Sequence, residues 1–174
     1  NKVHALNGVS LEIYEGEFCA IVGTSGSGKS TMLNMLAGLE KPTKGEVVIN
    51  GEHIEKMNEN QLVKFRRDHV GFIFQSFNLL QTMTAQENVA LPLVFRGADK
   101  KERLKKAGDL LDLVGLPGHK KHKPNEMSGG QQQRVGVARA LVVDPEIIFA
   151  DEPTGNLDSN TSRDIMNMMQ KVVR

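Results

Sequence analysis

The chain is short of several features, and each absence excludes a class of protein. Its 174 residues include one cysteine, so a disulfide framework is excluded. No apolar stretch reaches the roughly 18 residues that a bilayer crossing needs, and no charged start followed by an apolar core indicates secretion. Any contact with a membrane is therefore expected to go through a partner protein.

The single cysteine, Cys19, lies within the apolar run of residues 18–22. A free cysteine behaves as a small apolar residue, so we predict a buried, reduced thiol. This prediction favours an intracellular protein.

A strong excess of either charge is also absent, since 22 basic and 21 acidic residues leave a formal net charge of +1. A nucleic-acid-binding protein carries a global basic bias, so no nucleic-acid partner is expected. One basic cluster lies beside an apolar stripe of helical spacing and is predicted to be the solvated face of a helix. It holds Lys100, Lys101, Arg103, Lys105 and Lys106.

A second basic run holds Lys120, Lys121 and Lys123 together with His119 and His122. A metal site is the alternative to a plain loop, but no acidic or thiol neighbour stands at ligand spacing. We therefore predict a surface loop.

A glycine-rich loop, Gly-Thr-Ser-Gly-Ser-Gly-Lys-Ser-Thr, occupies residues 23–31. It follows the apolar run 18–22, which we predict to be a strand, and precedes the helix-compatible residues 32–37. Its glycines let backbone N–H groups turn inward, and the helix that follows directs its N-terminal dipole at an anion. The loop is therefore predicted to bind a polyphosphate through Gly23, Thr24, Ser25, Gly26, Ser27, Gly28, Lys29, Ser30 and Thr31.

Two side chains of this loop have specific predicted roles. Lys29 would reach the β- and γ-phosphates, and Ser30 would offer its hydroxyl to Mg²⁺. A dinucleotide-binding loop is excluded because Thr31 stands where its third glycine is required.

Further along the chain, Ser128-Gly129-Gly130-Gln131 precedes a run in which Val135, Ala138, Leu141 and Val142 recur at helical spacing. Serine and two glycines ahead of a helix form another N-terminus suited to an anion. Alone, such a turn usually only caps a helix. Its place between the phosphate loop and the next motif favours a functional role.

The next motif is a short apolar run, Ile147-Ile148-Phe149-Ala150, that ends in Asp151 and Glu152. The run is typical of a strand buried in a parallel sheet. Beside a phosphate loop, Asp151 is predicted to hold Mg²⁺, and Glu152 is predicted to act as the general base on the attacking water.

With these motifs the chain resembles the nucleotide-binding domain of ABC transporters, nearly from end to end. Residues 23–31 resemble the Walker A motif, residues 128–131 the signature motif, and residues 147–152 the Walker B motif. Gln75, after the strand-like run 70–74, resembles the Q-loop glutamine, and Asn156-Leu157-Asp158 resembles the D-loop. Residues 74–80 and 84–89 are most similar to the lipoprotein-releasing, macrolide-exporting and FtsE-type group.

The resemblance implies an ATPase that hydrolyses MgATP as a head-to-tail homodimer. Lys29, Gln75 and Glu152 are its implied catalytic residues, and Ser30, Gln75 and Asp151 its implied metal ligands. The signature motif of the facing subunit is also implied to contact the nucleotide, through Ser128, Gly129, Gly130 and Gln131. The cofactors are then ATP and Mg²⁺.

The resemblance also implies an integral-membrane permease partner and a place on the cytoplasmic, inner face of the plasma membrane. Gln75 would couple the nucleotide site to this permease. The apolar residues that follow have two open interpretations, a groove for the partner or burial within a helical lobe. They are Phe77, Leu79, Leu80 and Met83.

Two family features are missing from the chain. The only tyrosine, Tyr14, stands too near Walker A to be the aromatic residue that stacks on adenine, and the last histidine, His122, precedes the signature motif. We therefore expect a domain truncated at both ends, which would hold nucleotide mainly by its phosphates.

The expected fold class is α/β, a P-loop NTPase (RecA-like) core with a helical subdomain and a small antiparallel β lobe. Residues 1–174 are predicted to form one domain. Residues 1–75 would form the β lobe and Walker A core, residues 76–142 the helical subdomain with the signature motif, and residues 143–174 the Walker B and D-loop part of the core.

Glycine, proline and asparagine residues, which favour turns, set the expected boundaries of helices and strands within this layout. Val9, Leu11 and Ile13 alternate as in a strand, and residues 47–49 lead into an Asn50-Gly51 hairpin turn. Helices are expected from 84 to 142, broken at Pro92, Gly97, Gly115 to Gly118 and Pro124. A last helix should bury Ile165, Met168, Met169 and Val172.

Two other functions are compatible with the same motifs. An ABC-type ATPase without a transport role would be split by coiled coils or zinc modules. Only about a hundred residues separate Walker A from the signature motif, and they contain no heptads or cysteine pairs, which argues against this alternative. A module that senses ATP without turnover is the second alternative, and Glu152 argues against it.

Overall fold

The computed structural model describes residues 5–173. Its helices are α1 (Lys29–Leu36), α2 (Glu59–His69), α3 (Ala85–Phe95), α4 (Lys100–Leu113), α5 (Gly129–Leu141) and α6 (Ser159–Val173). Its strands are β1 (Val48–Ile49), β2 (Glu52–His53), β3 (Val70–Phe74) and β4 (Ile147–Asp151). Three short 3₁₀ turns complete the described elements, η1 (Ile54–Lys56), η2 (Pro117–His119) and η3 (Pro124–Glu126).

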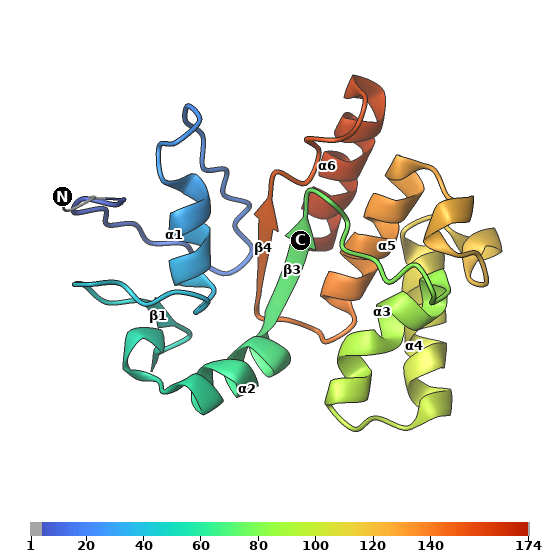
Figure 1. Cartoon of the computed structure of the whole chain (residues 1–174), viewed down its shortest axis with the longest axis horizontal. Helices are drawn as coiled ribbons and strands as arrows, with labels where there is room; N and C mark the ends of the chain where they lie inside the picture. Colours follow the sequence, from blue (N-terminus) through green and yellow to red (C-terminus); the bar gives the residue numbers. More distant parts are fainter. Residues whose placement is uncertain (1–4, 174) are drawn as a thin grey trace.

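The centre of the molecule is a parallel pair of strands, β3 and β4 (Figure 1). Their register runs from Val70 opposite Ile147 to Phe74 opposite Asp151. Both strands are rich in β-branched and aromatic residues, which fit a sheet buried on both faces. The two strands predicted from the sequence at these positions are confirmed.

The helices α3, α4 and α5 form a layer beside β3, and α6 packs against α5 (Figure 1). The stripe predicted on α4 lies in the core, with Ala107, Leu111 and Val114 buried. Lys100, Lys101 and Lys105 of the same helix are exposed, as predicted. On α6, Ile165 and Met169 are buried, so these two members of the predicted apolar face are confirmed.

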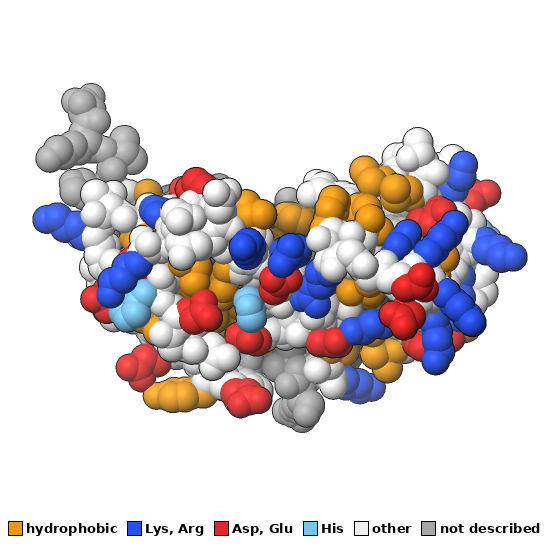
Figure 2. Space-filling view, turned by 90° about the horizontal axis from the view of Figure 1, so that it is seen from below, with side chains coloured by type: hydrophobic (Ala, Val, Ile, Leu, Met, Phe, Trp, Pro, Cys, Tyr) orange, Lys and Arg blue, Asp and Glu red, His pale blue; other side chains and the backbone are white. Residues whose placement is uncertain are grey.

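The outer surface over the helical end carries charges of both signs. Figure 2 shows Lys, Arg, Asp and Glu side chains interspersed there, with apolar side chains visible between them. None of the helices described here combines the length and the apolar character that crossing a membrane requires.

Pro92 does not break a helix as the sequence analysis expected, because it lies inside α3. Proline removes one backbone hydrogen bond and costs on the order of 3 kcal/mol in a helix interior. The helix continues because Val89, Ala90 and Leu93 around it are buried in the core, and tertiary packing overrides local propensity.

The strands expected before the phosphate loop are also absent, since residues 5–28 form no strand or helix. Val22 is 88% exposed and the Cys19 thiol is exposed, so the prediction of a buried cysteine is wrong. An apolar run becomes a strand only where a neighbouring strand satisfies its backbone groups. Here β4 pairs with β3, and no described segment pairs with residues 18–22.

The hairpin predicted at Asn50-Gly51 is confirmed, because β1 and β2 pair antiparallel across it. Asn50 has φ 50° and Gly51 has φ 81°, the left-handed pair that a two-residue hairpin turn needs. Behind the hairpin, Ile54, Leu62 and Phe149 belong to a second core cluster, which joins η1 and α2 to β4.

The loop between β3 and α3 is held by a buried amide, that of Asn88. Its Oδ1 accepts from Leu80 N at 2.8 Å. Its Nδ2 donates to the carbonyls of Leu80, Met83 and Thr84 at 3.0 to 3.2 Å. One side chain therefore satisfies four backbone groups of a segment that has no secondary structure of its own.

We expect Asn88→Ala to lower the free energy of unfolding by about 1 to 3 kcal/mol, because buried backbone groups lose their partners. Urea denaturation measures this loss. Asn60→Ala, an exposed asparagine of α2, is the matched control and should change stability by no more than about 0.5 kcal/mol. Equal losses in the two variants would contradict the role assigned to Asn88.

Candidate functional site

The phosphate loop, residues 23–31, turns tightly and opens directly into α1. Gly28 precedes the helix with φ 91°, and Gly26 has φ 77°, so both lie in the left-handed region that favours glycine. A Cβ at Gly23 would meet Ser27 Oγ at 2.7 Å. The first N–H groups of α1 have no partner within the helix and face the mouth of this loop.

Lys29 folds back over the loop. Its Nζ donates to the carbonyls of Gly23 at 2.9 Å and Thr24 at 2.8 Å. Both acceptors are neutral, so these bonds position the ammonium without cancelling its charge. The loop thus combines unpaired backbone donors with a fixed cation, the two elements that bind an anion.

The loop meets the end of β4 through Ser30. Its Oγ donates to Asp151 Oδ1 at 3.3 Å, across 121 positions of sequence. A hydroxyl and a carboxylate are the oxygen ligands that Mg²⁺ prefers when waters fill its other positions. Among the residues described, no group of three or more His, Cys, Asp or Glu is arranged to hold a metal. A sparse oxygen pair of this kind fits Mg²⁺ bound largely by phosphate and water.

Glu152 follows Asp151 in a left-handed backbone conformation, with φ 43°, and it is exposed. This region is unfavourable for a residue with a side chain, and such residues concentrate at functional sites. Because Phe74 pairs with Asp151, the next residues on the two strands, Gln75 and Glu152, leave the sheet side by side. The predicted residues of the two strand ends are therefore brought together.

The described contacts of Gln75 are to residues that follow Glu152. A Cβ at Gly155 would lie 2.5 Å from Gln75 Nε2, and Asn156 Nδ2 donates to Gln75 O at 3.0 Å. In the described residues no hydrogen bond joins Gln75 to Ser30 or Asp151. Its predicted part in metal binding therefore remains a prediction.

The signature turn, residues 128–131, caps α5. Ser128 N donates to Gln131 Oε1 at 2.8 Å, and Gln131 N donates to Ser128 Oγ at 3.3 Å. This reciprocal capping box fixes the orientation of the serine. A Cβ at Gly130 would meet Thr161 Cγ2 at 2.6 Å, so the turn lies directly against α6.

The D-loop aspartate, Asp158, caps the first turn of α6. Thr161 donates to its carboxylate through Oγ1 at 2.5 Å and through N at 3.1 Å. These bonds, first that of the hydroxyl and then that of the backbone, lower the pKa of the Asp158 carboxyl. The aspartate is thus held as an anion beside the signature turn.

Within one chain the phosphate loop and the signature turn do not form one site. Figure 1 shows α1 and α5 on opposite sides of the β3–β4 pair. Lys29, which begins α1, and Ser128, which caps α5, therefore lie apart within one chain.

Two polar residues of α5 hold segments next to the site, and they were not predicted as site residues from the sequence. Gln133 is buried, and its Nε2 donates to Pro153 O at 2.6 Å. Arg139 donates to Phe77 O at 2.8 Å and Asn78 O at 2.5 Å, and burial lowers the pKa of its guanidinium. Their only sequence signal is a polar side chain within the apolar stripe of a helix.

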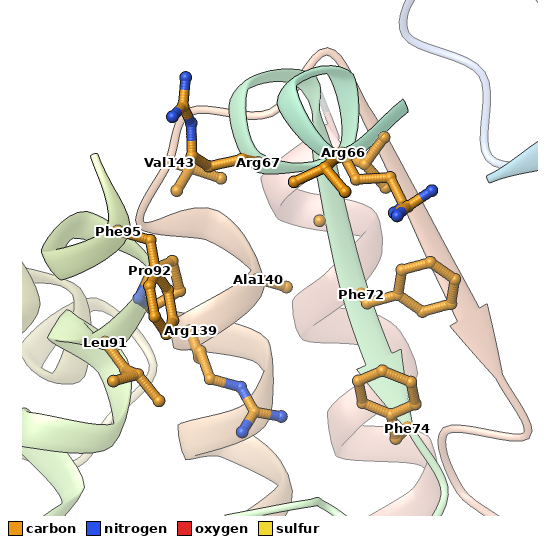
Figure 3. Close-up of a pocket in the computed structure, with 13 residues that line it drawn as sticks. Arg66, Arg67, Phe72, Phe74, Leu91, Pro92, Phe95, Arg139, Ala140 and Val143 are labelled. Atoms are coloured by element: carbon orange, nitrogen blue, oxygen red, sulfur yellow. The ribbon is translucent and has the colours of Figure 1, made fainter. Parts of the chain in front are cut away.

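Arg139 also borders an open hollow of about 580 Å³ (Figure 3). Figure 3 shows Leu91, Pro92 and Phe95 of α3 on one side and β3 on the other. The complete lining comes from α2, β3, α3 and α5, together with the second residue after α5. It consists of Val63, Arg66, Arg67, Val70, Gly71, Phe72, Phe74, Leu91, Pro92, Phe95, Arg139, Ala140 and Val143.

The apolar residues that follow Gln75 do not line this hollow. Leu79 is buried in the core cluster that includes Val89 and Leu93, and Phe77 packs against this core. Of the two open interpretations, burial within the helical lobe therefore holds for these two residues. Leu80 is 46% exposed and does not belong to that core.

The comparisons with known proteins agree with this geometry. The family described as ABC transporter matches residues 6–155. The chain is 52% identical over 174 residues to the ABC transporter ATP-binding protein YtrE of Bacillus subtilis, covering 100% of this chain and 75% of YtrE. It is 52% identical over 171 residues to the macrolide export ATP-binding/permease protein MacB of Hyphomonas neptunium, covering 98% of this chain and 26% of MacB.

Among solved structures, the chain is similar to the ATP-binding cassette MJ0796, a protein of Methanocaldococcus jannaschii. The TM-score is 0.86 with 51% identity, over 98% of this chain and 75% of the other. That structure is described as a dimer in a post-hydrolysis state, bound to ADP and Pi. The fold, the motifs and these matches agree, and the chain belongs to the ABC transporter family of ATP-binding proteins.

Proposed function

We propose that this chain is the ATP-binding subunit of an ABC transporter and that two copies hydrolyse MgATP between them. The contact between Ser30 and Asp151 carries the proposal, because it joins the phosphate loop to the strand end that holds Glu152. The similar cassette MJ0796, described as a dimer with ADP and Pi, supports it.

The residues of one chain supply binding and proton transfer in this proposal. Lys29 neutralises charge on the β- and γ-phosphates, while the N–H groups that open α1 donate to phosphate oxygens. Ser30 and Asp151 hold Mg²⁺, with Gln75 at the same edge. Bound there, Mg²⁺ supplies charge neutralisation for the triphosphate. Glu152 takes a proton from the attacking water as general base.

The second copy completes the site. Since the phosphate loop and the signature turn lie apart in one chain, a nucleotide on Lys29 can meet Ser128 only from a facing subunit. A head-to-tail pair supplies two such sites by symmetry. Bound ATP then favours the closed pair, and its hydrolysis weakens that preference.

We propose further that the hollow beside Arg139 receives a segment of an integral-membrane permease at the cytoplasmic face of the membrane. Phe95, which lines the hollow, is 68% exposed, and its neighbour in α3, Val94, is 44% exposed. Such an exposed apolar surface is typical of a docking site. Arg139 links the hollow to the segment after Gln75 through Phe77 O and Asn78 O. MacB, named as an ATP-binding/permease protein, carries both functions in one chain, which supports this pairing.

Lys29→Ala is expected to abolish tight nucleotide binding, because the loop loses its only point charge for the phosphates. Calorimetry with MgATP measures the affinity. Lys44→Ala, at an exposed lysine outside the loop, serves as the control and should bind as the unmodified protein does. Unchanged affinity in Lys29→Ala would refute the assignment of the loop.

Glu152→Gln is expected to keep ATP binding while turnover falls about 10²- to 10⁴-fold, as when a general base is removed. Hydrolysis opens the pair, so this variant should accumulate as an ATP-bound dimer in size-exclusion chromatography. Glu59→Gln, an exposed acid at the start of α2, is the control. A monomer with undiminished hydrolysis would refute both the base and the shared site, whereas a protein with no turnover in any form would favour an ATP sensor.

Phe95→Glu tests the docking hollow, since a carboxylate there opposes burial against a permease. We expect about a tenfold smaller fraction of the protein in the membrane pellet of its host, because burying a Phe side chain contributes about 1.5 to 3 kcal/mol and this contribution is lost. ATP hydrolysis by the purified protein should be unchanged. Leu113→Glu is the matched control, because Leu113 is 65% exposed on α4, away from the hollow. Equal membrane fractions for both variants would refute the docking site.

A further inference from the structure

We propose that His119 is a positioning residue for the signature turn, and that a proton on its Nε2 releases that turn. The inference rests on the proposed function only in taking Ser128 as a residue that meets nucleotide on a facing subunit. It concerns a loop that the sequence analysis treated as plain surface.

The hydrogen bonds of Gln131 fix which of its atoms faces the histidine. Its Oε1 accepts from Ser128 N at 2.8 Å. Its Nε2 lies 3.0 Å from His119 Nε2. An amide that presents its oxygen to Ser128 has only its NH₂ group left, so Gln131 donates and His119 accepts.

This direction fixes the state of the imidazole. A nitrogen that accepts carries no proton, so His119 is neutral and bears its hydrogen on Nδ1. That Nδ1 is buried and makes no hydrogen bond to the described residues. The ring lies 4.9 Å from the ring of His122, whose Nδ1 is likewise buried without a described partner.

Protonation of His119 Nε2 would place two donors against each other. The N–H of the imidazolium and the NH₂ of Gln131 cannot share a hydrogen bond, so the two side chains must separate. If the amide rotates to offer its oxygen to the histidine, Ser128 N loses its acceptor instead. That rotation breaks the capping box that orients Ser128.

The charged groups around this turn do not counter the added proton. On the side of α4, Asp112 is paired with Lys120 at 2.7 Å. From η3, Glu126 accepts from Lys123 N, and from α3, Glu87 accepts from Thr84 N. On α5, Gln131 is neutral and Arg134 donates to Val114 O. Lys121 adds only positive charge, and no described hydrogen bond or ion pair joins a carboxylate to His119.

The functional consequence is a loss of turnover on the acid side. Each pH unit of acidification on the limb where Nε2 takes up a single proton should lower the fraction with an ordered signature turn by up to about tenfold. The loss should appear in the assembly of the ATP-bound pair, because Ser128 acts across the interface. Nucleotide binding to the phosphate loop of one chain should be unaffected.

Variants of His119 distinguish a positioning role of this residue from a purely structural one. His119→Gln keeps an acceptor that cannot titrate, so its hydrolysis should lack this acid loss. His119→Leu removes the acceptor, so its turnover should be low at every pH while its affinity for MgATP as a monomer stays unchanged. His122→Gln is the matched control, because His122 contacts the ring of His119 and makes no described bond to Gln131. It should keep the acid loss.

A measurement independent of activity accompanies these assays. Nitrogen NMR of the imidazoles near pH 8 should show His119 as the Nδ1–H tautomer, with its unprotonated Nε2 bonded to the Gln131 amide. An Nε2–H tautomer would overturn the proposal, as would an acid loss that persists in His119→Gln. If the unmodified protein hydrolyses no ATP at any pH, the proposed function fails, while the tautomer still decides the role of His119.

Discussion

The in-register pairing of β3 with β4 is the constraint on which the candidate site depends. Parallel strands bring their carboxyl ends to one edge, and the register places Gln75 next to Glu152 there. The contact between Ser30 and Asp151 then attaches the phosphate loop to the same edge. A slip of one residue would turn the side chains of one strand to the opposite faces of the sheet and separate the two acids from their neighbours.

The helix α5 carries this arrangement into the rest of the molecule. Its start presents Ser128, its middle holds Pro153 through Gln133, and its end holds the segment after β3 through Arg139. A helix is stiff over this length, so a displacement at one of these points moves the other two. The hollow, the strand ends and the signature turn are thus connected through one rigid element.

Much of the site could be predicted from sequence, because its signals are local. The strands β3 and β4, the Asn50-Gly51 turn and the capping of α5 follow from patterns a few residues long. The strand expected at residues 18–22 and the burial of Cys19 were wrong, because pairing and cover depend on segments distant in the chain. Gln133 and Arg139 could not be predicted, since their acceptors are backbone carbonyls that only the tertiary structure supplies.

The backbone of Glu152 has a consequence for engineering of the protein. A left-handed residue with a side chain costs on the order of 1 to 2 kcal/mol, and glycine at that position is free of this cost. Selection of variants for heat resistance would therefore favour glycine at 152 and remove the carboxylate that we propose as the general base. Selection for stability and selection for catalysis therefore favour different residues at this position.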